Sequence, residues 1–467
     1  MGDRRRTQRV ETIAQALAEQ PGVTIPELFD RKYDIQAAYD LFARPEATPD
    51  AIQAGHRRWV KAQLRTPGRY LLIEDTSFLS FTHRPGHVEG LGPIGGSGEG
   101  QQGFLLHSVL AVRATAPTGP DATGRRGPLE VLGFADQQSL IRTPRPPGEP
   151  RGNASRRQRE RESQRWLDSG TRIGPAPPEA AIRWVRVADR EADIYEYLQG
   201  CRDLGHGFLV RVTQDRVLLD PATGQRQGLV FDHVAGVEPA GGLYLKLRGR
   251  PGVAPRRAKL LISFGPIRLR SPERTGQAAG AGPPVDCWFV RAWETEPPEG
   301  VEPLEWVLYG DQEVATLEAA LGVVMDYGSR FFIEEFHKGL KTGLKAERLQ
   351  LETGSRLFAA IAVMSVVALR LIDLRELGRS DPTATVERTG LELLELAVLG
   401  LATHRELTTV AEVLLAIGRL GGHMNRVGDG MPGWITLWRG MTKLRLLVQG
   451  AKLGQELDPT ETHGQYT

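Results

Sequence analysis

The spacing of hydrophobic positions changes twice along the chain. Residues 1–65 carry apolar side chains at helical spacing, interrupted by prolines, and this pattern predicts several short helices. From Tyr70 the pattern becomes that of β-strands, because RYLLIEDTSFLSF, GFLLHSVLAVRA and LEVLGFADQQSLI are apolar runs separated by Gly- and Pro-rich segments. From residue 311 to the end helical spacing returns. Beyond the segment around residue 334, it predicts helices at 357–374, 387–421 and 433–453.

The middle of the chain predicts an α/β fold. A helix is expected at about 155–172, and AIRWVRVADREADIYEYLQG reads as a strand that runs into a helix. GFLVRVTQDRVLLD is expected to be one more strand, and residues 217–310 look all-β. Strands and helices in this order form an α/β core with a β-rich insertion. The predicted domains are an N-terminal helical domain at 1–65, a core at 66–374 with the insertion at 216–310, and a C-terminal helical domain at 375–467.

The bulk composition narrows the class of protein. A chain of 467 residues with 40% hydrophobic and 25% charged residues is typical of a soluble protein of two or three domains. Cys201 and Cys287 provide neither a disulfide framework nor a metal cluster, which favours a reducing cytoplasm. The N-terminal MGDRRRTQRV has no apolar segment behind it and is not expected to be a secretory signal. The longest apolar run, 357–369, is too short to span a bilayer and predicts a buried helix.

Charge indicates a nucleic-acid partner only locally. The net charge of +2 does not by itself indicate a nucleic-acid partner. Residues 151–165 hold six arginines against two glutamates, and residues 246–270 hold eight Lys and Arg and no acid. Such stretches suit a phosphate backbone, although ordinary solubility charge explains either stretch alone.

Residues 327–341 concentrate polar side chains on one side of a predicted helix. At 100° per residue, five of them project within an arc of about 80°: Tyr327, Arg330, Glu334, Lys338 and Lys341. The apolar residues on the opposite side form an expected buried stripe: Phe332, Ile333, Phe336 and Leu340. The plain alternative is a solvated helix face that carries an i,i+4 pair such as Glu334–Lys338.

Two aspartates join this helix face in a chemical hypothesis. Asp75 and Asp189 are predicted to lie at the ends of strands, where ligands gather in α/β folds, although Asp is also common in turns and helix caps. With Glu334 they supply three carboxylates, which can hold two divalent cations such as Mg²⁺ about 3.5–4 Å apart for in-line phosphoryl displacement. The cations of the same helix face are then expected to bind phosphates, with a tyrosine hydroxyl as a further donor: Arg330, Lys338, Lys341 and Tyr327.

These motifs resemble those of a known family. The spacing Tyr327-x2-Arg330-x3-Glu334-x6-Lys341 is similar to the Y-R-E-K signature of bacterial DDE transposases of the insertion-sequence-four family, especially the hairpin-forming, cut-and-paste type. IEDTSFLSF, DREADIYEYL and IEEFHKGLKTG resemble the motifs of that family, in the same order. The likeness extends from GDRRRTQRV and AAYDLFARPEATPDAI to IGRLGGHMN, nearly the whole chain. Phe331-Phe332 departs from it, replacing an aromatic–arginine pair and with it one phosphate contact.

The resemblance implies a fold and a site. The core is expected to be ribonuclease-H-like, with Asp75, Asp189 and Glu334 as the catalytic triad that binds two Mg²⁺ ions, for which Mn²⁺ can substitute. The N-terminal domain is expected to bind DNA, through residues that include Arg4–Arg6, and the helical C-terminus to dimerise.

The resemblance also implies a reaction and its partners. Strands are nicked at the transposon ends, hairpins form and open, and the ends are transferred into target DNA. Trp306 is expected to stack on a base flipped out during hairpin formation, with a core aromatic as its alternative. The expected partners are double-stranded DNA and a second copy of the chain in a synaptic complex, without a membrane, in the bacterial cytoplasm at the nucleoid.

Two other functions stay open. One is a DNA-binding protein derived from a transposase, such as a repressor; the three intact carboxylates speak against it. The other is a Mg²⁺-dependent nuclease that hydrolyses DNA without joining it; Trp306 argues against this function, because hydrolysis needs no flipped base.

The residues next to the predicted triad have other expected roles. His337 is interpreted as a phosphate or structural contact, and Glu335 is not assigned as a ligand because it projects about 100° away from Glu334. Arg190 and Glu191 are expected to pair locally or to orient the loop.

Overall fold

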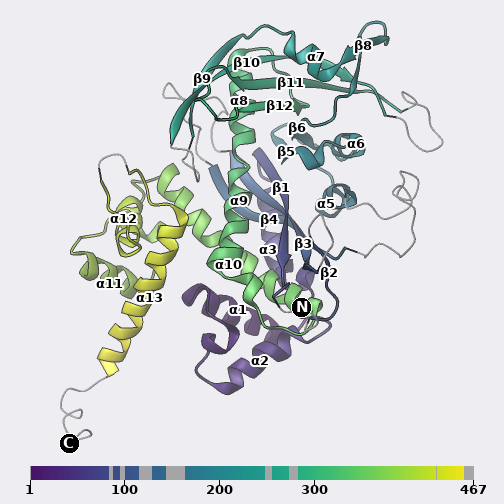
Figure 1. The fold of residues 1–467 in the computed structure, drawn as a ribbon. Helices are drawn as coiled ribbons and strands as arrows, with labels where there is room; N and C mark the ends of the chain where they lie inside the picture. The colour runs from purple at the N-terminus through teal and green to yellow at the C-terminus, as the bar shows by residue number, and fades with distance from the viewer. Residues whose placement is uncertain are drawn as a thin grey trace, which may run out of the picture.

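The computed structural model contains a mixed sheet with helical regions on both sides (Figure 1). It describes residues 2–83, 88–94, 100–114, 129–142, 163–247, 255–272, 282–426 and 429–456. The described strands form one twelve-stranded sheet. In the view of Figure 1 the β-rich insertion lies at the top, the N-terminal helices at the bottom and the C-terminal helices at the left.

Three helices open the chain, as the sequence predicts. They are α1 (Arg4–Glu19), α2 (Lys32–Phe42) and α3 (Pro49–Gln63). The carboxylate of Asp3 caps α1 by accepting hydrogen bonds from the backbone N–H groups of Arg5 and Arg6. Thr48 caps α3 in the same way, ahead of a proline at the first helical position. α3 packs against the edge of the sheet at β4 and against α10, which ties the N-terminal region to the core.

The core half of the sheet begins with the three predicted strands. Its strands are β1 (Gly68–Ser80), β2 (Gly92–Pro93), β3 (Gln102–Ala114), β4 (Leu129–Leu140), β5 (Ile182–Ala188) and β6 (Gly207–Arg211). β4, β3 and β1 pair antiparallel, whereas β1, β5 and β6 pair parallel, which gives the spatial order β4–β3–β1–β5–β6.

The insertion extends the same sheet from β6. Its elements are β7 (Val217–Leu219), β8 (Arg226–Leu229), α7 (Val230–Ala235), β9 (Gly241–Leu247), β10 (Arg256–Leu269), β11 (Val285–Glu294) and β12 (Glu305–Gly310). The prediction that 217–310 is all-β is therefore wrong at α7. The single strand predicted for 207–220 is also wrong, because the carboxylate of Asp193 accepts the backbone N–H groups of Thr213 and Gln214 and turns the chain between β6 and β7.

Helices cover both faces of the core sheet. α5 (Gln164–Ile173) and α6 (Tyr195–Asp203) lie on one face, and α8 (Leu317–Gly328), α9 (Phe331–Lys338) and α10 (Gly354–Ser380) pack on the other. Alternate residues of β1 point to opposite faces. Leu71 and Ile73 therefore join the buried cluster that includes α9 and α10, whereas Tyr70 and Leu72 join a cluster on the α5 side. Asp75, two residues after Ile73, lies on the α9 side.

The long helices end at places that the sequence pattern did not show. The predicted helix through 327–341 is broken between α8 and α9 and ends in a π-helical turn, Gly339–Gly343. The predicted helix at 387–421 is two helices, α11 (Leu393–Thr403) and α12 (Val410–Leu420), because His404 adopts a left-handed conformation with φ 53°. α13 spans Trp434–Glu456. The helix expected at 155–172 is α5, which begins at Gln164; residues 155–162 lie outside the described residues.

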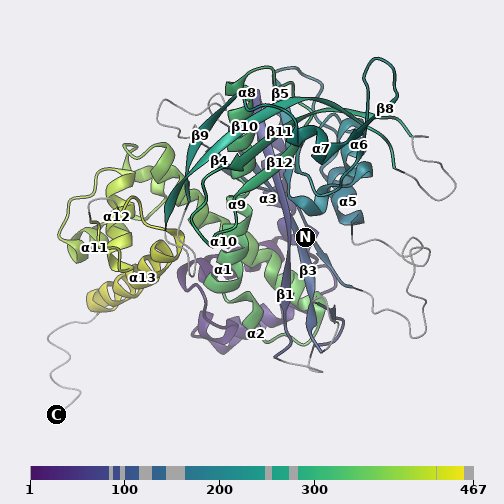
Figure 2. The ribbon, with the colours of Figure 1, turned by 45° about the horizontal axis from the view of Figure 1, so that its top comes forward.

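α10 is longer than the apolar run that predicts it. Its stretch Gly354–Gly378 is long and apolar enough to cross a membrane by length and composition alone, which on its own is weak evidence for a span. Of its most apolar window, 71% is buried inside the protein, as expected of a core helix. α10 contacts α1, α3 and α13, and it runs through the middle of the molecule in both views (Figures 1 and 2).

Candidate active site

Two of the three predicted acidic residues lie on neighbouring strands. Asp75 lies in the middle of β1, so the prediction that it ends a strand is wrong: β1 stays paired with β3 as far as Ser80. Asp189 directly follows β5, as predicted, and accepts the backbone N–H of Glu191 at 2.9 Å. In the parallel pairing of β1 with β5, Ile73 lies opposite Val187. Asp75 and Asp189 each follow two residues later, and the charge of Asp189 acts on the carboxyl of Asp75.

Arg330 brings the third carboxylate into the site. Its Nη2 lies 3.1 Å from Oδ2 of Asp75 and 3.6 Å from Oε1 of Glu334. Arg330 is only 8% exposed, and its Nη1 is buried with no hydrogen-bond partner among the residues that the structure describes. The guanidinium thus links β1 to α9, and its Nη1 has no partner among the described residues.

The electrostatics of Asp75 show that the acids influence one another. Burial raises the pKa of this carboxyl to about 6; Arg330 opposes the rise, and the charge of Asp189 adds to it. Burial also lowers the pKa of Arg330, but its acidic neighbours, Asp75 first, outweigh burial and the pKa is raised overall. A half-buried pair of carboxylates beside a buried guanidinium is an arrangement that a divalent cation would stabilise.

The donor set fits a hard cation by its chemistry. Asp75, Asp189 and Glu334 offer carboxylate oxygens, the ligands that Mg²⁺ prefers. Within the described ranges, however, no group of three or more His, Cys, Asp or Glu side chains is close enough to hold a metal ion. Arg330 lies between Asp75 and Glu334 in this conformation, so three-fold coordination requires a rearrangement there.

The predicted helix face is only partly a surface. Tyr327 is buried against Trp306 of β12, with ring centroids 5.3 Å apart in a T-shaped arrangement. Glu334 and Lys338 are exposed, and the Lys338 ammonium lies 5.8 Å from the ring of Trp434. Lys341 is half-buried, with its Nζ 4.0 Å from a carboxylate oxygen of Glu347. The break between α8 and α9 explains why the residues do not form one continuous face.

The neighbours of Glu334 have structural contacts. Glu335 forms an ion pair with Arg375 of α10, which supports leaving it out of the ligand set. His337 is buried beside Phe336, and burial lowers its pKa to about 3, so its imidazole is neutral at pH 7. A neutral, buried imidazole packs in the core and attracts no phosphate by charge.

A buried arginine that the sequence analysis missed connects the two aspartate segments. Arg165 of α5 donates from Nε to Oγ1 of Thr76 at 2.8 Å and from Nη2 to Glu191 at 2.5 Å. Thr76 in turn donates its backbone N–H to Asp75 at 2.8 Å. Of the two alternatives for Glu191, local pairing is not what the structure shows, since its partner Arg165 comes from α5, whereas orientation of the loop stays a prediction. Arg165 ends the basic stretch interpreted as a DNA-binding surface, yet it is only 6% exposed; residues 151–162 lie outside the described part of the chain.

A second buried network supports the same strands from the opposite face. Glu74 is fully buried and accepts hydrogen bonds from Arg186 of β5, at 2.9 Å from Nε and 2.5 Å from Nη2. The Tyr197 hydroxyl also donates to Glu74. Burial raises the pKa of Glu74, but Arg186 and then His107 outweigh burial and lower it to about 2. The sequence holds one signal for this pair, an acid and a base within otherwise apolar strands.

The basic residues expected to bind DNA are placed unevenly. Arg4 and Arg5 are exposed in the first turn of α1, whereas Arg6 is half-buried and lies 3.2 Å from Glu46.

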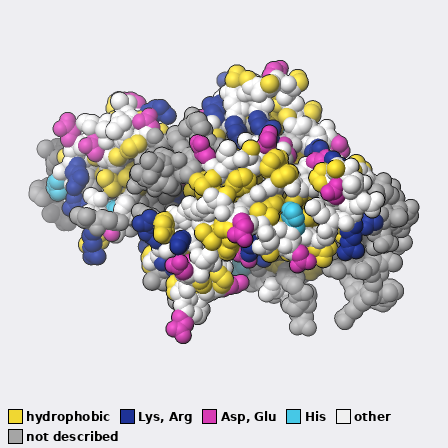
Figure 3. All heavy atoms as spheres, turned by 90° about the horizontal axis from the view of Figure 1, so that it is seen from above, with side chains coloured by type: hydrophobic (Ala, Val, Ile, Leu, Met, Phe, Trp, Pro, Cys, Tyr) yellow, Lys and Arg dark blue, Asp and Glu magenta, His cyan; other side chains and the backbone are white. Residues whose placement is uncertain are grey.

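Much of the described part of the basic stretch 246–270 is neutralised by acids of β11 and its following turn. The pairs are Arg256–Glu294, Lys259–Glu296 and Arg268–Asp286. Hydrophobic, basic and acidic side chains accordingly lie intermixed on the top face of the molecule (Figure 3). Within the described residues of this stretch, the cations therefore do not form a continuous basic surface.

The mixed α/β fold thus holds two carboxylates, Asp75 and Glu334, against one buried arginine. Two family models match the ends of the chain. The model described as "Transposase DNA-binding" matches residues 1–47, and the "Transposase Tn5 dimerisation domain" matches residues 366–461. The chain thus carries a transposase DNA-binding domain and a Tn5-type dimerisation domain, which support a bacterial transposase of the Tn5 type.

Proposed function

We propose that this protein is a DDE transposase that moves DNA by a cut-and-paste reaction. It nicks transposon ends, forms and opens hairpins, and transfers the freed ends into target DNA. The observation that carries the proposal is the pairing of Arg330 with Asp75 of β1 and with Glu334 of α9, beside Asp189, whose charge raises the pKa of both Asp75 and Arg330. The family matches at both ends of the chain support the same reaction class.

The order of the core strands supports a ribonuclease-H-like core. Three antiparallel strands, β4–β3–β1, continue into the parallel strands β5 and β6. Asp75 on the central strand and Asp189 after the adjacent parallel strand lie at neighbouring positions of this sheet. A helix from the C-terminal part of the core supplies Glu334.

The triad would hold Mg²⁺, or Mn²⁺ in its place. When bound, the cations supply Lewis acidity that activates the attacking hydroxyl group and stabilises the leaving oxygen. Arg330 contacts Asp75 and Glu334, and it would bind a phosphate oxygen through Nη1, which has no partner in the described residues, once the side chain opens to the DNA. Lys338, exposed on α9, and Lys341 bind the DNA backbone on the same side.

Hairpin formation requires a base to leave the stack, and Trp306 is proposed to receive it. The indole is half-buried at the start of β12 and packs edge-on against Tyr327, three residues before Arg330. This contact with Tyr327 supports a role for the indole near the proposed site. Tyr327 is proposed to position the indole and to donate its hydroxyl to a phosphate.

The proposed assembly is a homodimer on DNA, working at the nucleoid of a bacterial cytoplasm. The DNA-binding and dimerisation matches support the two partners. Cys201 and Cys287 are both buried free thiols, which agrees with a reducing compartment.

The test is a cleavage assay on the DNA that flanks this gene in its source. An end-labelled duplex is incubated with wild-type, Asp189→Ala or Trp306→Ala protein, with and without Mg²⁺, and resolved on a denaturing gel. We expect metal-dependent nicks and then a hairpin from the wild type, neither from Asp189→Ala, and nicks with little hairpin from Trp306→Ala. DNA binding without any product from the wild type would contradict the proposal and favour a repressor. Nicks without a hairpin from the wild type would favour a nuclease.

A further inference from the structure

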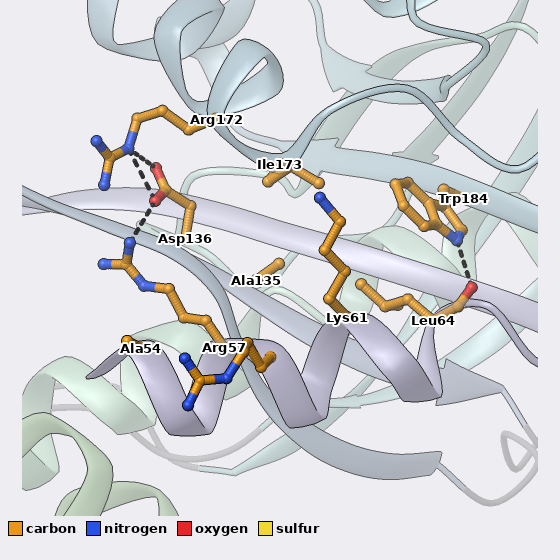
Figure 4. A pocket seen from close by; sticks show the side chains of 10 residues that line it. Ala54, Arg57, Lys61, Leu64, Ala135, Asp136, Arg172, Ile173 and Trp184 are labelled. Atoms are coloured by element: carbon orange, nitrogen blue, oxygen red, sulfur yellow. Dashed lines mark hydrogen bonds and ion pairs between the residues drawn. The ribbon is translucent and has the colours of Figure 1, made fainter. Parts of the chain in front are cut away.

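A basic pocket lies on the face of the sheet opposite to Asp75. It has a volume of about 330 Å³ and opens between α3, β4 and α5 (Figure 4). Trp184 of β5 forms part of its floor, on the face shared with Tyr70 and Leu72 rather than with Ile73 and the triad. Four cations line the pocket: Arg57, Arg58, Lys61 and Arg172.

A buried carboxylate fixes two of these cations. Asp136 is 1% exposed and accepts hydrogen bonds from Nε of Arg172 at 3.0 and 3.1 Å. Nη1 of Arg57 lies 3.2 Å from the same carboxylate. Asp50, outside the pocket lining, contacts Arg57 at 2.7 Å and Arg172 at 2.5 Å. The two guanidiniums are therefore held in place by two acids.

The charges of the other two cations, Arg58 and Lys61, are not neutralised by a carboxylate among the described residues. Arg58 and Lys61 are exposed and have no ion-pair partner in the described part of the chain. Nε of Arg57 is buried and likewise has no acceptor there. Four cations against Asp136 and Asp50 leave two positive charges and one unused donor, which is the chemistry of a phosphate site.

We propose that this pocket binds the phosphate backbone of a second DNA segment, separate from the segment cut at Asp75. Arg58 and Lys61 lie on one side of α3 about 4.5 Å apart along its axis, and exposed Arg65 follows just past the helix end. A row of cations that continues beyond the pocket fits a continuous backbone better than a single free anion. Because Asp75 is on the other face of the sheet, one straight duplex does not reach both. The inference rests on DNA binding and not on the proposed chemistry.

The experiment measures the salt dependence of DNA binding by the full-length protein. Fluorescence anisotropy of a labelled 20-bp duplex of arbitrary sequence is followed over a range of NaCl concentrations in EDTA, so that no strand is cut. Wild type is compared with Arg58→Gln/Lys61→Gln and with a control that removes the same charge from exposed sites elsewhere, Arg202→Gln/Arg226→Gln. Circular dichroism and thermal melting establish that all three are folded alike.

Loss of two phosphate contacts lowers the slope of log K against log [salt] by about 1 to 2. We therefore expect the pocket variant to show that smaller slope and roughly tenfold weaker binding at 0.1 M NaCl, with the control close to wild type. Equal slopes for wild type and pocket variant would overturn the inference. A thermal shift with inorganic phosphate that the pocket variant loses, while its DNA slope stays unchanged, would also overturn it and assign the pocket to a free anion. Failure of the wild type to cut DNA would refute the proposed function. The comparison of DNA-binding slopes would still test this inference, because it is measured without cleavage.

Discussion

Neutralising Glu74 should destabilise the two strands that carry the aspartates. Glu74 precedes Asp75 on β1 and is hydrogen-bonded to Arg186, which lies three residues before Asp189 on β5. Both side chains are almost completely buried, at 0% and 1% exposure. Glu74→Gln keeps the shape of the side chain but leaves the Arg186 guanidinium without its counter-charge in the core.

Two estimates of the cost agree. Removing one partner of a buried ion pair typically costs about 3–5 kcal/mol. Independently, the pKa of Glu74 falls from an ordinary 4.5 to about 2, and this difference corresponds to about 3 kcal/mol of stability at pH 7. We therefore expect Glu74→Gln to lower the free energy of unfolding by about 3 kcal/mol or more at pH 7.

The same reasoning fixes the pH dependence. A carboxylate whose pKa is lower in the folded state stabilises the protein fully above its unfolded pKa, and this contribution is lost as the pH falls toward the folded pKa. The difference between wild type and Glu74→Gln should thus shrink as the pH falls from 7 to 3. Urea unfolding at the two pH values, with equal m-values required, measures it.

Two controls make the result interpretable. Glu130 of β4 is an exposed carboxylate paired with Arg113 at 3.0 Å, and Glu130→Gln should cost less than about 1 kcal/mol. Glu74→Leu/Arg186→Met removes both charges and should recover at least half of the loss. A cost of Glu74→Gln no larger than that of Glu130→Gln, or one independent of pH, would refute the role assigned to the pair.

Two further predictions concern the site and the assembly. Arg165→Gln removes the hydrogen bonds to Thr76 and Glu191, and the displaced aspartates should slow strand nicking by roughly 10- to 100-fold. DNA binding measured by anisotropy should stay unchanged, which distinguishes this effect from unfolding. An unchanged nicking rate would contradict the prediction. Leu446 and Leu453 are 63% and 61% exposed on α13, inside the matched dimerisation region. Leu446→Glu/Leu453→Glu should therefore shift the protein from dimer to monomer, as measured by light scattering, without lowering its melting temperature. A dimer that persists in this variant would show that these two leucines do not form the dimer interface.

Local patterns predicted the elements that depend on local sequence. The apolar runs predicted β1, β3 and β4 correctly, and the position of Asp189 follows from the end of an apolar run. Asp75 was placed at a strand end because four largely apolar residues precede it. The strand nevertheless continues, since β3 pairs with it as far as Ser80, and such a long-range partner leaves no mark on the sequence of β1 itself.

The break in the helix through 327–341 and the support of the site were harder to predict. At the end of α8, the Ser329 hydroxyl donates a hydrogen bond to the backbone carbonyl of Asp326. The side-chain carboxylate of Asp326 lies 2.5 Å from Arg69 of β1, a partner far away in the sequence. Arg165 lies in a charged stretch, which on its own suggests a phosphate-binding or solvated surface, and only its contacts with β1 and the loop after β5 show that it is buried. The role of a buried charged residue depends on its ion-pair partner, and the spacing of residues along the sequence does not identify that partner.

The most direct test of the central claim compares nicking by three isosteric variants. Asp75→Asn, Asp189→Asn and Glu334→Gln each remove one carboxylate charge from the proposed triad, and Glu318→Gln removes one from the exposed side of α8 as a control. Initial nicking rates are measured on the DNA that flanks the gene, in Mg²⁺, after anisotropy shows equal DNA binding. The account predicts that each triad variant loses at least about 10³-fold in rate while Glu318→Gln keeps the wild-type rate. A triad variant that nicks DNA at nearly the wild-type rate would contradict it.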